Sequence, residues 1–184
     1  PFLGLPLPLL PLHILWVNLV TDGLPGLALT AEPAERGIMQ RPPRPPGETI
    51  FARGMWQHIL WVGALMSGLV LGLQYWGITN GVTHWQTMVF TALTFAQLAH
   101  VMVIRSDRES LLTIGILSNQ PLAITVGLTV ALQLSLIYTP ALNRIFDTAA
   151  LTPLELGLCF ACAAVVLLAV EGEKWLVRHG GLYR

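Results

Sequence analysis

The sequence predicts an all-α fold, a polytopic membrane bundle of five transmembrane helices within one domain, residues 1–184. The composition is 54% hydrophobic and only 11% charged, whereas soluble proteins average about 25% charged residues. The long apolar runs are nearly free of charge, and the exception is Asp22. A spanning helix needs about 20 mostly apolar residues, and five stretches satisfy this requirement: 9–29, 56–76, 85–104, 121–138 and 153–170.

Each stretch has boundary signals that justify it. The first ends before the polar, proline-rich loop 30–55. The second begins at Trp56 and ends at Trp76, and the third begins at Trp85, as expected for rings that favour the headgroup region. The fourth and fifth each begin at a proline that follows a segment containing charged residues. These are Pro121 and Pro153.

The basic residues predict the orientation, because lysine and arginine favour the cytoplasmic side of a membrane. In a five-helix zigzag every basic residue except Arg144 falls on one side, which places the N-terminus outside and the C-terminus in the cytoplasm. An odd number of helices that starts outside, with Pro1 in place of methionine, leads us to expect that the chain is a piece of a longer protein. The net charge is zero, which gives no indication of nucleic-acid binding.

One helix contains a polar face. Asn18 is followed three and four residues later by Thr21 and Asp22, a spacing that puts all three on one side of an α-helix. At about 1.5 Å per residue, Asp22 lies roughly 20 Å from the outer end, inside a hydrocarbon core about 30 Å thick. A central aspartate costs about 2.5–3.5 kcal/mol on insertion scales. The carboxylate is therefore expected to be paired, protonated or bound to a cation.

Directly after this face, Gly23, Pro25 and Gly26 predict a helix break. Pro25 has no N–H, so a carbonyl near Thr21 loses its hydrogen bond. Freed carbonyls, a carboxylate, an amide and a hydroxyl form an all-oxygen set, the kind of ligand that Ca²⁺ prefers. Two other interpretations remain open: a hydrogen bond from Asp22 to a neighbouring helix, and a proton relay through Asp22.

The segment HILWVNLVTDGLPGLALTAEP resembles the sixth transmembrane helix of P-type cation-transporting ATPases, most closely the calcium-pump subgroup. The next segment, ERGIMQRPPRPPGE, is similar to the cytoplasmic loop of that family. The resemblance extends over all five helices, which then correspond to helices six to ten. It implies that Asn18, Thr21 and Asp22 bind the transported Ca²⁺.

The resemblance implies further roles. Gln97 occupies the position of an acidic ligand in two-site calcium pumps, so it is a weaker metal ligand and suggests one Ca²⁺ per cycle; a helix-bridging role for Gln97 is the alternative. Gly68 and Gly72 are expected to pack against an earlier helix of the pump. The expected coupling loop, which would contact the phosphorylation domain, contains Arg41, Pro42, Pro43 and Arg44.

The sequence contains no P-loop and no D-K-T-G-T phosphorylation motif. The resemblance therefore implies that ATP and Mg²⁺ bind to domains outside this segment, which is not catalytic by itself. Its expected partners are the lipid bilayer, the N-terminal helices and the cytoplasmic domains of the same pump. The plasma membrane is the expected location. Na⁺, K⁺ or Mn²⁺ pumping, or a non-enzymatic membrane module, are the alternatives to calcium export.

The remaining residues with reactive side chains are expected to have packing or interfacial roles. Cys159 and Cys162 are small residues within an apolar run. The five histidines include no pair at metal-ligand spacing on one helix: His13, His58, His84, His100 and His179.

Overall fold

The computed structural model describes residues 4, 6–34, 39, 47, 54–106 and 109–180. The described part is helical, with five helices long and apolar enough to cross a membrane, which confirms the predicted all-α class. The first span is built from α1, η1 and α2: Pro11–Trp16, Val17–Gly23 and Leu24–Leu29. The other four spans are α3 (Met55–Thr79), α4 (Trp85–Val103), α6 (Gln120–Tyr138) and α8 (Pro153–Arg178). Two short helices lie between them, α5 (Leu111–Ile114) and α7 (Pro140–Phe146).

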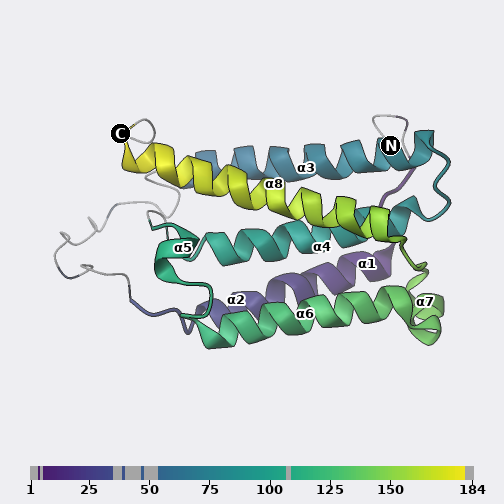
Figure 1. Cartoon of the computed structure of the whole chain (residues 1–184), viewed down its shortest axis with the longest axis horizontal. Helices are drawn as coiled ribbons and strands as arrows, with labels where there is room; N and C mark the ends of the chain where they lie inside the picture. The colour runs from purple at the N-terminus through teal and green to yellow at the C-terminus, as the bar shows by residue number, and fades with distance from the viewer. Residues whose placement is uncertain are drawn as a thin grey trace.

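Helix α4 is the centre of the bundle. Figure 1 shows α3 and α8 on one side of it and the first span with α6 on the other. In α4, 61% of the span is buried, against 28% or less in each of the other four spans. The main core lies between α4 and α8, where Met88, Phe95 and Cys159 are almost completely buried. The Phe95 ring stacks on that of Phe160 at 4.5 Å between centroids.

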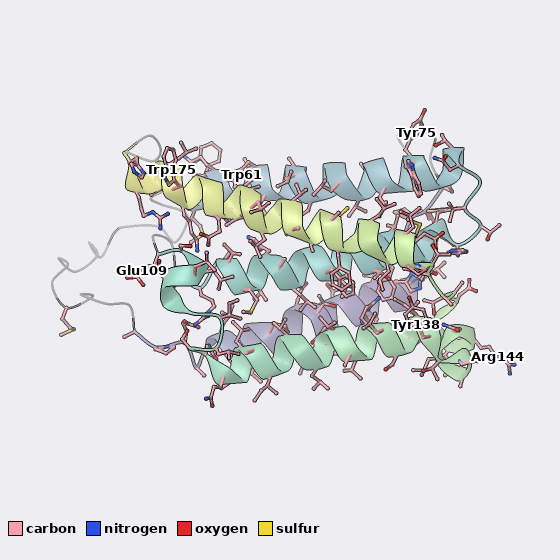
Figure 2. The ribbon with its side chains drawn as sticks, in the orientation of Figure 1. Trp61, Tyr75, Glu109, Tyr138, Arg144 and Trp175 are labelled. Atoms are coloured by element: carbon pink, nitrogen blue, oxygen red, sulfur yellow. The ribbon has the colours of Figure 1, made fainter. Side chains whose placement is uncertain are left out.

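The two ends of the bundle differ in chemistry. Figure 2 shows Trp61, Trp175 and Glu109 at one end, and Tyr75, Tyr138 and Arg144 at the other. Amphipathic rings at both ends are typical of membrane interfaces. Arg105, just after α4, and Lys174, near the end of α8, lie at the end with α5, where they bond to the Gly115 and Glu109 carbonyls. Which end faces the cytoplasm stays a prediction.

Helix ends depart from the sequence boundaries where polar residues are accommodated. Helix α8 continues to Arg178, whereas the predicted span ends at 170. Its N-terminus is fixed by a capping box, in which the Thr152 side chain accepts from the Glu155 N–H and the Glu155 carboxylate accepts from the Thr152 N–H. Helix α3 runs to Thr79 rather than stopping at Trp76. The short helices α5 and α7 lie in segments expected to be loops.

The turn between α3 and α4 is tightly packed at one glycine. A Cβ built on Gly77 would lie 2.8 Å from the Trp85 Cβ, closer than real carbon atoms approach. We expect Gly77→Ala to lower the free energy of unfolding by about 1–3 kcal/mol, because overpacking forces the backbones apart. Thermal unfolding in detergent micelles measures the change. The matched control is Gly63→Ala in the same helix, where an added Cβ meets nothing within 4 Å; equal effects in the two variants would contradict the prediction.

Candidate cation site

The first span contains a π-helical segment over Val17–Gly23, and the three candidate ligands lie within it. A π-helix joins residues five apart, and such turns occur frequently at functional sites. The turn does not depend on the glycine at its end, since a Cβ on Gly23 would make an ordinary contact, 3.4 Å, with the Asn18 carbonyl oxygen five residues back. The backbone stays helical through Pro25 and Gly26, in α2. The expected break is thus replaced by a change of helix type that precedes the proline.

The π-helical turn separates the three side chains. Thr21 is 2% exposed and faces the bundle, whereas Asn18 and Asp22 are exposed on its outer surface. The physical reason is the wider turn: each residue of a π-helix advances by a smaller angle than in an α-helix. Around the helix axis, Thr21 is therefore further from Asn18 than it would be in an α-helix, and the two side chains do not share a face. The described residues offer no hydrogen-bond or ionic partner to the Asp22 carboxylate.

Helix α4, which contacts η1, contains further buried oxygen atoms. The Gln97 Oε1 and the Thr94 Oγ1 are buried, as is the Thr21 Oγ1, and none of the three has a hydrogen-bond partner in the part of the chain that the structure describes. Leaving such an atom unsatisfied costs about 1–3 kcal/mol, so each one calls for a structural or functional reason. Sequence reasoning missed Thr94. Its signal was the helical spacing, three residues before Gln97.

The described residues do not form a complete metal site. No group of three or more His, Cys, Asp or Glu side chains within them is arranged to hold an ion. Cys159 and Cys162 are free thiols, and the Cys159 thiol donates to the Met88 carbonyl. Any cation bound here would therefore use carboxylate, amide, hydroxyl and carbonyl oxygens, completed by groups from outside the described residues.

Buried polar contacts hold the first span against its neighbours. The Trp16 indole donates to Gln133 Oε1 at 3.0 Å, and the Gln133 amide donates to Thr91 Oγ1 at 3.3 Å, which links the first span, α6 and α4. The His13 ring stacks on Phe90 at 4.3 Å between centroids. These contacts set the position of η1 against α4.

A buried arginine fixes the other end of the first span. The Arg105 guanidinium donates to both carboxylate oxygens of Glu32, with N···O distances of 2.9 and 2.7 Å. It also donates to the Gly115 carbonyl at 3.0 Å and to the Ser118 hydroxyl. Burial alone would raise the pKa of Glu32, but the hydrogen bonds from Arg105 and Asn119 and the charge of Arg105 hold it below its ordinary value.

Two sets of predicted residues remain without a described partner. The coupling-loop residues Arg41, Pro42, Pro43 and Arg44 lie outside the described residues. Gly68 and Gly72 lie on an exposed face of α3, and an added Cβ at either meets nothing within 4 Å in the described structure. Their packing role stays a prediction.

The fold defines a multi-pass α-helical membrane protein, and its first span contains a polar π-helical turn. Comparison with protein families then gives the particular family: residues 6–176 match the model described as "Cation transporting ATPase, C-terminus". The chain belongs to this family of cation-transporting P-type ATPases.

Individual relatives agree with the family. The chain is 38% identical to the calcium-transporting ATPase of Bacillus subtilis (strain 168), with 93% of the chain and 19% of the relative covered. It is 34% identical to calcium-transporting ATPase 1 of Bacillus cereus, covering 92% of the chain and 21% of the relative. It is also 34% identical to the mouse calcium-transporting ATPase type 2C member 2, covering 95% of the chain and 19% of the relative. The chain thus spans about a fifth of the length of these relatives.

Proposed function

We propose that this chain is part of the transport domain of an ATP-driven pump that exports Ca²⁺ from the cytoplasm. Asn18, Thr21 and Asp22 supply part of an intramembrane cation site, and Gln97 is a weaker ligand. The observation that carries the proposal is the π-helical turn Val17–Gly23, which holds all three residues at membrane depth in the first span. The names of the relatives support Ca²⁺ as the ion.

The exposure of Asp22 bears on how the site is completed. A carboxylate facing lipid near the bilayer centre costs about 2.5–3.5 kcal/mol, so this face is better explained as a surface covered by protein. We propose that other helices of the complete pump cover it and contribute the remaining oxygens. The exposed glycine face of α3, with Gly68 and Gly72, receives another of those helices through close backbone approach.

The other parts of the cycle lie outside this segment. In the proposal, ATP and Mg²⁺ bind to cytoplasmic domains of the same protein, and the loop with Arg41 and Arg44 relays their state to the first span. The segment is located in the plasma membrane. Its N-terminus lies outside the cell and its C-terminus lies in the cytoplasm. An amide at Gln97 is a weaker ligand for a hard cation than a carboxylate would be, which supports one Ca²⁺ per cycle.

Ion competition tests the proposal. The complete protein in inside-out vesicles is expected to accumulate radioactive Ca²⁺ when ATP is added, with one Ca²⁺ bound for each phosphorylated protein. Excess Na⁺ or K⁺ should leave the uptake unchanged, because a set of neutral and anionic oxygens around one carboxylate favours a divalent ion. Uptake of Na⁺, K⁺ or Mn²⁺ in preference to Ca²⁺ would show that the pump transports that ion instead of Ca²⁺. Absence of ATP-driven uptake of any cation would favour a non-enzymatic module.

A further inference from the structure

Three ionisable side chains meet at the end of the bundle where α3 begins and α4 and α8 end. The His58 Nδ1 lies 2.6 Å from Glu173 Oε2, and the His58 Nε2 lies 3.2 Å from the His100 Nε2. The Trp61 indole N–H donates to the other carboxylate oxygen of Glu173 at 2.8 Å. The three residues come from three different helices, α3, α4 and α8. Their spacing in the sequence therefore did not indicate that they form a cluster.

The geometry of the two rings is that of a hydrogen bond. Their planes differ by 18° and their centroids are 5.5 Å apart, while the facing nitrogens are 3.2 Å apart. The rings are therefore nearly coplanar and point at each other head to head. Two imidazoles that shared a tetrahedral metal ion would instead point at a common third position. One Nε2 must donate and the other must accept, so exactly one proton lies between them.

The hydrogen bonds determine where each proton lies. With Glu173 ionised, His58 donates from Nδ1, which leaves its Nε2 as the acceptor from the His100 Nε2–H in the neutral pair. An added proton binds at the free Nδ1 of His100. The proton on the His100 Nε2 then passes to the His58 Nε2. The result is an imidazolium at His58, in contact with the Glu173 carboxylate, and a neutral His100 that now accepts.

We propose that His58, His100 and Glu173 form a binding site for a single proton at this end of the bundle. The carboxylate stabilises the first added proton, because an opposite charge in contact favours the charged imidazole. A second proton would bring two positive rings head to head and remove the hydrogen bond between them. The site therefore holds one proton where two separate histidines would hold two.

The surroundings of the site are consistent with this count. Lys174 on α8 adds a further positive charge near the rings, and its ammonium donates to the Val103 and Glu109 carbonyls and pairs with Glu171 at 3.5 Å. Among the residues that the structure describes, the other charged groups at this end are Arg105, paired with Glu32, Arg178 on α8 and the Glu109 carboxylate. The His58 side chain is 22% exposed, against 8% for Glu173, so the histidine is the more accessible of the two.

Nuclear magnetic resonance of the full chain, labelled with ¹⁵N-histidine and placed in lipid nanodiscs, tests the proposal. At neutral pH we expect a scalar coupling between the two Nε2 nuclei through their hydrogen bond. On acidification the pair should take up one proton, and the second should need more than about tenfold higher proton concentration. His179, which is exposed at the end of α8, is the reference ring.

Two variants separate the site from a packing contact. Glu173→Gln should lower the affinity of the pair for its first proton by about tenfold or more, since it removes the facing charge. The matched control is Glu155→Gln, which removes the partner of His84 at the opposite end of α8 and should leave the pair unchanged. The proposal is wrong if His58 and His100 each take a proton independently in the pH range of His179. It is equally wrong if micromolar Zn²⁺ binds to both rings at neutral pH and displaces the shared proton.

Discussion

Asp22→Asn in the complete pump is expected to abolish Ca²⁺-activated phosphorylation from ATP. The substitution keeps the size of the side chain and one oxygen atom but removes the charge that compensates a divalent ion in a low-dielectric site. Asp22 is the only acidic residue within the first span and α4, the two spans that contain the proposed ligands. The loss should therefore exceed that of Asn18→Ala or Gln97→Ala, each of which removes a neutral ligand. Phosphoenzyme formed from labelled ATP over a range of Ca²⁺ concentrations measures it.

The control for this variant makes the same chemical change elsewhere. Asp147 lies outside the spans, between α7 and α8, in a left-handed backbone conformation with φ 51° that asparagine also tolerates. Asp147→Asn should leave Ca²⁺ activation intact. Asp22→Asn should also leave thermal unfolding of the segment unchanged, because the carboxylate is exposed and has no partner among the described residues. Unchanged Ca²⁺ affinity in Asp22→Asn would remove the basis of the proposed site.

Arg105→Ala is expected to destabilise the segment by about 3–5 kcal/mol, the range for breaking a buried ion pair on one side. The Arg105 side chain is fully buried. Its loss removes the charged partner of Glu32, which keeps only the hydrogen bond from Asn119, and one donor to the Gly115 carbonyl, which keeps that from Ser118. Arg105→Lys should recover only part of this, since an ammonium cannot donate in parallel to both carboxylate oxygens. Chemical or thermal unfolding in detergent measures the change. Arg144→Ala, at an exposed site of the opposite end, should stay within about 0.5 kcal/mol of the parent.

The same pair predicts a dependence on pH. The pKa of Glu32 is lowered in the folded state, so the contribution of the ion pair is complete above the ordinary glutamate range. It is lost as the pH falls through the lower, folded-state pKa. Glu32→Gln should remove this part of the acid sensitivity while keeping the shape of the side chain. Identical acid unfolding of Glu32→Gln and the parent would show that the ion pair is not responsible.

The course of the chain could be predicted from the sequence because hydropathy alone identifies spans. The ends could not. Helix α8 passes through Glu171, Glu173 and Lys174, which end an apolar run but not a helix, because these side chains find partners on α3, α4 and the segment before α5. A hydropathy scale includes the charge of these residues but not the interactions that stabilise them.

The residues of the cation site stay a prediction, and the geometry of the first span around them could not be predicted from the sequence. Asn18, Thr21 and Asp22 would share a face in an α-helix. The local sequence does not indicate whether this turn is α-helical or π-helical. Packing decides between them: Thr21 is buried against the bundle while its two companions stay outside. The histidine pair was unpredictable for a related reason, since His58 and His100 are separated by 42 positions and meet only through the packing of α3 on α4.

The central position of α4 has a consequence for synthesis. Its mean hydropathy is 1.3, against 2.3 for α8, so it enters the bilayer with the weaker driving force. Its most extensive contacts are with α8, the last of the five spans to be synthesised, as in the bond from Cys159 to the Met88 carbonyl, 71 positions apart. Until that helix arrives, the middle of the bundle lacks its main partner. Quality control of the nascent protein would therefore act most strongly on chains truncated just before residue 153.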